Sequence, residues 1–166
     1  MRTFSSIRGL PVFLQQTGAK IGVIEEVCID EAGNVKGFII DVEGFLKRDR
    51  YLPFEKVSAV GRDGIIVAYT QSAFHRPVLQ PNEHHLHDPK KGVWGKSLYT
   101  TEGEKLGMIA DVYFQEELGK ITGYQVSDGF FADVTEGKKR IPAYSTCSIG
   151  EEAVFITCRD DMSSTI

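Results

Sequence analysis

The sequence has few cysteines, and none of them form a pair with the spacing of a metal-binding or redox motif. Cys28, Cys147 and Cys158 are an odd number of thiols with no CxxC spacing. Secreted proteins that depend on disulfides have a denser and even set of cysteines. We therefore expect reduced thiols in a cytoplasmic protein, where they pack as small apolar side chains.

Long apolar runs are absent as well. No uninterrupted apolar stretch approaches the roughly 20 residues that a membrane-spanning helix needs. Residues 1–6 (MRTFSS) lack the apolar run of a signal peptide. The expectation is a soluble protein in the cytoplasm, with contact to a membrane surface left open.

The sequence also lacks the common catalytic motifs. It contains no G-x-S-x-G, no P-loop and no G-x-G-x-x-G. Paired acids occur at positions 25–26, 116–117 and 151–152, in turn and strand-edge patterns where such pairs are usually solvated. The sequence therefore predicts neither an enzyme nor a bound cofactor.

An internal repeat is the most informative feature that is present. Residues 18–24 read GAKIGVI and residues 103–109 read GEKLGMI, at an offset of 85 positions. The same order continues downstream through these matched pairs: Val27 and Val112, Gly33 and Gly119, Val35 and Ile121, Gly44 and Gly129, Leu52 and Ile141, Val60 and Ile149. Glycines matched in order, with apolar positions preserved between them, predict an internal duplication.

Each copy has the pattern of short β-strands. Residues 21–29 and 35–42 are rich in β-branched side chains, and the turn-forming residues 30–34 (DEAGN) separate them. Apolar spacing typical of a long helix is absent, so only a short helical turn is expected, at residues 54–57. Because open sheets expose their edges, a small barrel per copy is the economical arrangement.

The predicted fold class is therefore all-β, with two small β-barrels in tandem related by internal duplication. The expected domains are residues 1–74 and 90–160, joined by a linker at 75–89 and followed by a polar tail at 161–166. Units of this size have thin cores, so we expect the two barrels to pack together.

The repeated pattern resembles the PRC-barrel family. Each copy has G-x-K-[IL]-G-x-I, then a glycine-containing turn, then G-[FY], [LI]-P and [VI]-G. That family includes the cytoplasmic domain of the photosynthetic reaction-centre H subunit and the C-terminal domain of a ribosome maturation factor. The resemblance implies two PRC-like barrels that serve as a docking or assembly module. Its motifs are glycines and apolar positions, which specify a fold but no chemistry.

All four histidines fall between positions 75 and 87. His84 and His87 are weak candidates for a zinc or nickel site, since imidazoles and nearby carboxylates bind these ions. A linker would lose conformational entropy on ordering around a metal, so we interpret the histidines as incidental to a polar linker. A metal site and a pH-responsive hinge remain the alternatives. Trp94 is expected to be buried between the second barrel and the linker.

One loop in each copy combines apolar and basic side chains and is the best candidate for a contact surface. The candidate residues are Phe45, Leu46, Lys47 and Arg48 in the first copy, and Phe130, Phe131, Lys138 and Lys139 in the second. Exposed apolar tips beside basic groups suit a groove on a protein or a lipid interface. The alternative is that Phe45 and Phe130 cap the barrel ends while the basic groups are solvated.

The leading functional hypothesis is a non-catalytic cytoplasmic docking module that binds a protein partner through these loops. The first alternative is a peripheral protein that contacts anionic lipid. Association with RNA or the ribosome is a further alternative suggested by one branch of the family. Residues 81–166 oppose it, because they carry nine basic side chains against fourteen acidic ones. The identity of the partner and the oligomeric state are left open.

Overall fold

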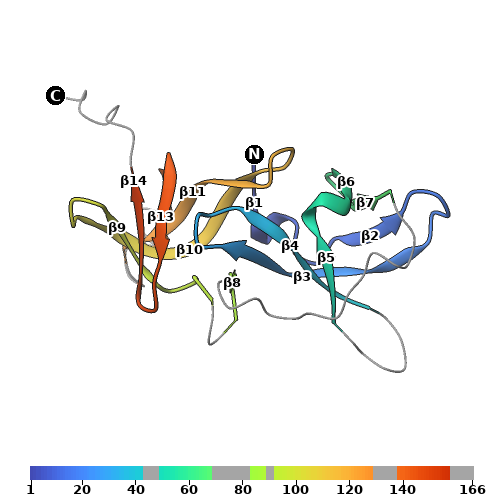
Figure 1. The fold of residues 1–166 in the computed structure, drawn as a ribbon, viewed down its shortest axis with the longest axis horizontal. Helices are drawn as coiled ribbons and strands as arrows, with labels where there is room; N and C mark the ends of the chain where they lie inside the picture. Colours follow the sequence, from blue (N-terminus) through green and yellow to red (C-terminus); the bar gives the residue numbers. More distant parts are fainter. Residues whose placement is uncertain (43–48, 69–82, 89–91, 129–137, 158–166) are drawn as a thin grey trace.

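Two sheets with the same strand order make up the protein. The computed structural model describes residues 1–42, 49–68, 83–88, 92–128 and 138–157. The first sheet has the order β5-β4-β3-β2-β7-β6 and the second the order β12-β11-β10-β9-β14-β13 (Figure 1). In both sheets the pairing is antiparallel except at one equivalent place, where β2 is parallel to β7 and β9 is parallel to β14. The expectation of a duplicated all-β fold is confirmed.

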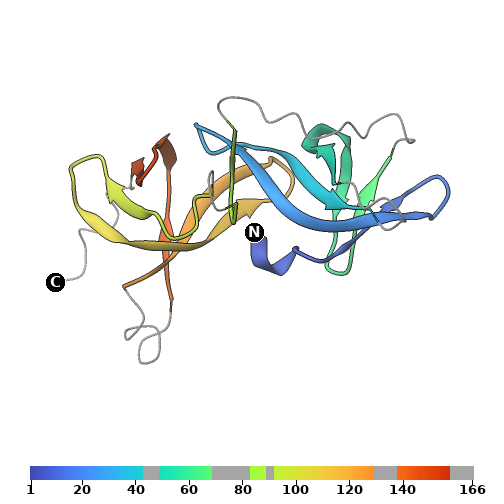
Figure 2. The ribbon, with the colours of Figure 1, turned by 90° about the horizontal axis from the view of Figure 1, so that it is seen from below.

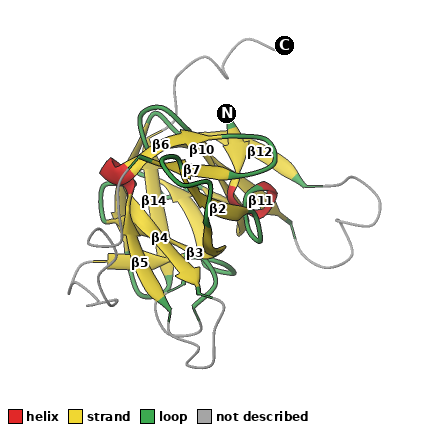
Figure 3. Cartoon of the chain, turned by 90° about the vertical axis from the view of Figure 1, so that its right-hand side faces the viewer, coloured by secondary structure: helices red, strands yellow, loops and turns green. Residues whose placement is uncertain are grey.

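The strand bounds show how closely the two copies correspond. The first repeat contains β2 (Pro11–Leu14), β3 (Lys20–Asp30), β4 (Val35–Asp41), β5 (Arg50–Pro53), β6 (Val57–Val60) and β7 (Ile65–Val67). The second contains β9 (Ser97–Thr100), β10 (Lys105–Gln115), β11 (Lys120–Ser127), β12 (Lys139–Pro142), β13 (Ser145–Ile149) and β14 (Ala153–Thr157). The helical segments of the described residues are two short 3-10 turns, η1 (Phe4–Ser6) and η2 (Phe54–Lys56) (Figure 3). The turn expected at residues 54–57 is therefore present.

The β3–β4 hairpin forms where turn chemistry separates the two β-branched runs. Its turn is closed by the Asp30 carboxylate, whose Oδ1 accepts hydrogen bonds from the backbone N–H groups of Ala32 at 3.0 Å and Asn34 at 2.8 Å. Gly33 has a φ of 80°, a conformation that a residue with a side chain rarely adopts. The equivalent hairpin in the second repeat turns at Gly119, which has a φ of 58°.

The tips of these two hairpins pair with each other across a local two-fold axis. The Val35 N–H donates to the Gly119 carbonyl at 2.6 Å, and the Ile121 N–H donates to the Gly33 carbonyl at 3.0 Å. Val35 and Ile121 are matched positions of the repeat, and so are the two glycines, so each bond is the counterpart of the other. The two repeats are thus arranged as the halves of a pseudo-symmetric dimer within one chain.

The two repeats also exchange the short strands that precede them. β1 (Arg2–Thr3) leads into the first repeat but pairs with β10 of the second, with Thr3 opposite Tyr113. β8 (Glu83–His85) leads into the second repeat but pairs with β3 of the first, with His85 opposite Cys28. We call residues 2–8 the first arm and residues 83–88 the second arm. Figure 2 shows the N-terminus in the middle of the molecule, between the two repeats.

Both arms contribute to one continuous core. Phe4 and Ile7 of the first arm and Leu86 of the second arm are fully buried, and they belong to the same cluster as the buried side chains of both sheets. Burying a side chain of this size stabilises a fold by about 1.5–3 kcal/mol. The expectation that the repeats pack together is confirmed, and neither repeat has a complete core without the arm of the other.

The structure differs from the sequence-based expectations at two places between the repeats. Residues 83–88 belong to the segment interpreted as a polar linker, yet they form β8 and bury Leu86 against the first repeat. Trp94 was expected to be buried but is 60% exposed. It lies at the position equivalent to Arg8, because Gly9 and Gly95 donate equivalent hydrogen bonds to the carbonyls of Ile24 and Ile109. In both repeats this position faces solvent. His75 lies outside the described residues.

Candidate functional site

Each arm is held by a buried carboxylate of the opposite repeat. Glu26 lies on β3 and Asp111 lies at the matched position of β10, and they are 9% and 3% exposed. Both follow an irregularity in the strand register, at Ile24/Glu26 and at Ile109/Asp111. A β-bulge of this kind redirects the next side chain, and here it directs a carboxylate toward the arm.

The hydrogen bonds of Glu26 join its own strand to the second arm. Its Oε1 accepts from the backbone N–H groups of Val27 at 2.9 Å and Leu86 at 3.1 Å, and its Oε2 accepts from that of His87 at 2.8 Å. Such charge-assisted bonds are stronger than those between neutral groups. The sequence predicts a solvated acid pair at positions 25–26, and this prediction is wrong for Glu26.

Asp111 makes the equivalent connection to the first arm. Its Oδ1 accepts from the N–H of Val112 at 2.8 Å and its Oδ2 from the N–H of Ser5 at 3.1 Å. The repeat carries the signal for both residues, because an acid directly precedes a matched valine in each copy.

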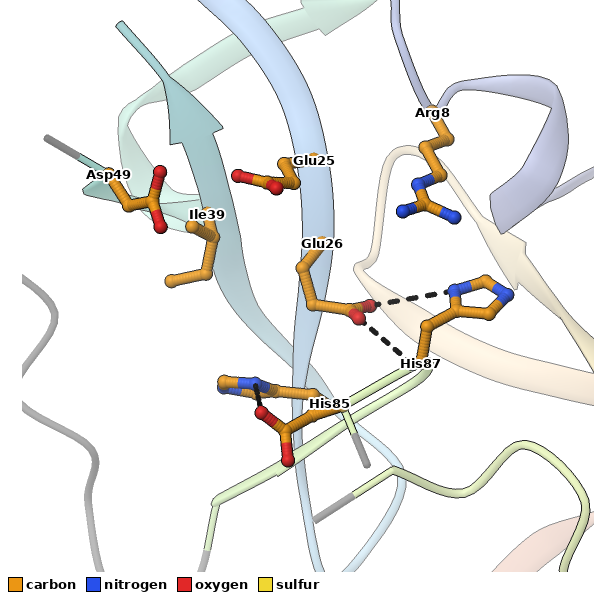
Figure 4. Close-up of a pocket in the computed structure, with 8 residues that line it drawn as sticks. Arg8, Glu25, Glu26, Ile39, Asp49, His85 and His87 are labelled. Carbon is orange, nitrogen blue, oxygen red and sulfur yellow. Dashed lines mark hydrogen bonds and ion pairs between the residues drawn. The ribbon is translucent and has the colours of Figure 1, made fainter. Parts of the chain in front are cut away.

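A pocket of about 340 Å³ lies beside the second arm, where it crosses the first repeat. Figure 4 shows its polar side chains converging from β3, from the residue that precedes β5, from the second arm and from the end of the first arm. The lining residues are Arg8, Glu25, Glu26, Ile39, Asp49, His85, His87 and Asp88. We call this the junction pocket.

Carboxylates dominate the charge of the junction pocket. Partial burial raises the pKa of Glu25 above its usual value, and the charge of Asp49 and a hydrogen bond with it raise that pKa further. Asp41 adds to the effect and Arg8 opposes it. The Glu25 carboxylate therefore stands beside a second carboxylate, and the repulsion between the two negative charges favours the neutral form of Glu25.

The two histidines of the pocket have different surroundings. His85 is 7% exposed, and its Nδ1 lies 4.0 Å from Asp88 Oδ2. The Nδ1 of His87 lies 4.0 Å from Glu26 Oε1, and its ring lies 6.0 Å from that of Phe4 in the first arm. His87 therefore stands at the contact between the two arms.

The metal site considered for His84 and His87 finds no support in this geometry. Within residues 83–88 and the rest of the described chain, no three or more His, Cys, Asp or Glu side chains are arranged to hold a metal ion. His84 lies on β8 opposite Ile29, whereas His87 follows the strand and faces Glu26 and Phe4.

A second polar cluster is buried under the second arm. The Cys28 thiol and the Tyr51 hydroxyl are both hydrogen bonded to the carboxylate of Glu83. Burial raises the pKa of both groups, and the negative charge of Glu83 raises them further. Cys28 thus stays protonated and packs as a small buried residue, which agrees with the expectation for this thiol. Cys158 lies outside the described residues.

Most of the predicted contact surface lies outside the described part of the chain. This applies to Phe45, Leu46, Lys47, Arg48, Phe130 and Phe131. Lys138 and Lys139 are described and exposed, and the Lys139 Nζ lies 3.3 Å from Asp128 Oδ2. The role of these loops stays a prediction.

A different apolar surface is visible on the outer faces of the two sheets. In the second repeat Tyr99 and Phe155 are cross-strand neighbours with stacked rings 5.9 Å apart, and Met108 lies on the adjacent strand. Phe155 is 37% and Met108 41% exposed. The matched residues of the first repeat are Phe13, Ile66 and Val23, all half-buried. We call these six side chains the outer stripes.

Comparison with known proteins identifies the fold family. The family model described as the PRC-barrel domain matches the chain twice, at residues 1–73 and 91–162. The chain is also 30% identical over 142 residues to the "Uncharacterized protein YrrD" of Bacillus subtilis (strain 168), a match that covers 85% of this chain and 78% of the relative. In the described residues no helix is long and apolar enough to cross a membrane. This chain belongs to the PRC-barrel domain family and contains two copies of that domain.

Proposed function

We propose that the protein is a non-catalytic docking module of the cytoplasm that binds a protein partner. The observation that carries this proposal is the pair of outer stripes, which present Phe13, Val23 and Ile66 in one repeat and Tyr99, Met108 and Phe155 in the other. Aromatic residues and methionine are enriched at protein interfaces, and contiguous exposed apolar surface marks a site of interaction.

The rigidity of the fold supports the same function. The exchanged arms and the paired hairpin tips join both repeats to one core. The two stripes are therefore held at a fixed separation, and a partner that contacts both binds without a further cost of ordering them.

Site-specific photo-crosslinking in the native cell tests this proposal. A benzophenone side chain at position 155, and in a second variant at position 13, is expected to capture the same partner. The matched control is position 118, because Leu118 is 67% exposed but lies outside the outer stripes. Adducts from position 118 alone, or none from positions 13 and 155, would contradict the proposal.

Loss-of-contact variants complete the test. Tyr99→Ser combined with Phe155→Ser is expected to weaken capture of the crosslinked partner while the urea midpoint changes little. Phe45→Ser combined with Phe130→Ser is also expected to weaken capture, because the loops that carry these residues are predicted to contact the partner. Unchanged capture by the first double variant removes the stripes from the interface, and unchanged capture by the second removes the loops.

The alternatives of lipid and RNA contact gain no specific support from the described residues. Of the basic side chains at the start of β12, Lys139 is paired with Asp128 and Arg140 lies 5.0 Å from the ring centre of Tyr113. Flotation with anionic vesicles and salt-dependent RNA binding are the direct checks, and a positive result in either would displace the protein-docking proposal.

A further inference from the structure

The positions that line the junction pocket have counterparts in the second repeat, and the residues at the two sets of positions differ in chemistry. The matched strand registers and hydrogen bonds place Ala110 at the position of Glu25, Lys138 at that of Asp49 and Trp94 at that of Arg8. Thr3 and Ser5 take the positions of His85 and His87.

The fold needs only one acid at each junction. Glu26 and Asp111 hold one arm each. The further acids Glu25, Asp49 and Asp88 line the junction of the first repeat only. Because the second repeat folds in the same way with alanine and lysine at two of these positions, the additional carboxylates are not a requirement of the structure.

Acidic side chains outnumber basic ones among the described residues that line the pocket. These residues contribute the carboxylates of Glu25, Glu26, Asp49 and Asp88, the guanidinium of Arg8 and two imidazoles. Glu26 uses its oxygens for backbone N–H groups of the strand and the arm, whereas Glu25 and Asp49 lie at the exposed side of the pocket. A cation between Glu25 and Asp49 would remove their mutual repulsion.

An independent observation points to a missing hydrogen-bond donor. His85 is more than nine-tenths buried and its imidazole lines the pocket, yet its Nε2 has no hydrogen-bond partner in the described structure. The Asp88 carboxylate lies on the side of the His85 Nδ1 and favours a proton on that nitrogen. Nε2 is then a buried acceptor, and leaving such a group without a donor costs free energy.

We propose that the junction pocket binds an organic cation through a guanidinium or primary ammonium group. Such a group supplies several N–H donors together with positive charge, which matches a pocket lined by carboxylates and by an imidazole with an unused nitrogen. A pocket of about 340 Å³ is also larger than a bare metal ion requires. The cation is either a basic side chain of a protein or a free small molecule, and the site is assigned independently of the docking function proposed above.

Titration of the intact protein with small probes tests the site directly. The probes are n-butylguanidine and n-butylamine, and the neutral control is n-butylurea, which has the shape of the guanidine without its charge. Saturable binding of the cations is expected in calorimetry, together with NMR shift changes at Ile39, His85 and His87. Binding of n-butylurea as strong as that of n-butylguanidine, or no saturable binding of either cation, would overturn the proposal.

Paired variants exclude a general attraction of cations to acidic surface. Glu25→Gln with Asp49→Asn is expected to weaken n-butylguanidine binding about tenfold or more, whereas the control Glu102→Gln with Glu104→Gln is expected to leave it unchanged. All four side chains are exposed, so the fold should persist, and the single variant Asp49→Asn replaces the pair if it does not. Equal weakening in both double variants would refute a specific site.

The source of the cation is distinguished by a third comparison. The blocked tripeptide Gly-Arg-Gly is titrated beside n-butylguanidine, with Gly-citrulline-Gly as its neutral control. Tighter binding of the arginine peptide indicates a protein side chain, and binding of the small cation alone indicates a metabolite. If the partner is still crosslinked at position 155 while no cation binds, the pocket proposal fails and the docking proposal stands.

Discussion

Removing the Glu26 carboxylate should destabilise the whole protein and not only one repeat. In Glu26→Ala the backbone N–H groups of Val27, Leu86 and His87 lose their acceptor. Val27 and Leu86 are fully buried, and a buried donor left unpaired costs about 1–3 kcal/mol, so these two alone give a loss of about 4 kcal/mol. Domains of ordinary size are stable by only about 5–15 kcal/mol, so the loss is a large fraction of the total.

The matched position predicts a graded series. Asp111→Ala removes the acceptor of Val112, which is buried, and of Ser5, which is exposed and can bind water instead. The expected loss is therefore smaller, about 2 kcal/mol. Glu104 is exposed at the turn between β9 and β10, and Glu104→Ala should stay within about 0.5 kcal/mol of the parent protein.

Urea denaturation measures the series, with far-UV circular dichroism and the fluorescence of Trp94 as two probes. Since both repeats share one core, we expect the two probes to give a single coincident transition in every variant. A Glu26→Ala midpoint equal to that of Glu104→Ala would refute the role of the carboxylate. A biphasic transition would refute the shared core.

Three further predictions use other parts of the fold. Gly119→Ala should lower the free energy of unfolding by about 2–4 kcal/mol, because the φ of 58° is unfavourable for alanine and the added Cβ would lie 2.5 Å from the Phe54 ring. Gly103 has a φ of 92° and open space around it, so Gly103→Ala should lower the free energy of unfolding by only about 1 kcal/mol in the same urea assay. Burial raises the pKa of Tyr124 to about 12. The phenol of the unfolded chain ionises near pH 10, so the free energy of unfolding should fall by about 1.4 kcal/mol per pH unit from about pH 10 to 12. The urea midpoint of Tyr124→Phe should fall less steeply over this pH range than that of the parent protein. Residues 83–157 expressed alone should form a dimer in which each copy's arm binds β10 of the other, and sedimentation showing a folded monomer would contradict the arm exchange.

The sequence predicted the parts of the fold that local chemistry determines. The runs at residues 21–29 and 35–42 are β3 and β4, because β-branched side chains and a glycine turn favour a hairpin wherever they occur. The duplication could be predicted for the same reason, since glycines and apolar residues in a fixed order report the repeated hairpins.

The arms and the junction pocket could not be predicted in this way. β1 and β8 are two and three residues long, and Glu83-His84-His85 has no apolar alternation that would indicate a strand. Their position depends on contacts with the opposite repeat, which no local pattern reports. An acid on a strand is usually solvated, so the sequence predicts a solvated Glu26. Only the arm that covers this side chain makes it a buried acceptor.

The exchanged arms also determine when the nascent chain can complete its fold. Ser5 leaves the ribosome 106 positions before Asp111, the residue that receives its N–H. At about 5–20 residues per second, the first arm waits roughly 5–20 s with Phe4 and Ile7 uncovered. The first repeat likewise stays incomplete until the second arm has been translated. Native structure is therefore reached only near the end of translation, and a stalled or truncated nascent chain would present these apolar side chains to chaperones and proteases.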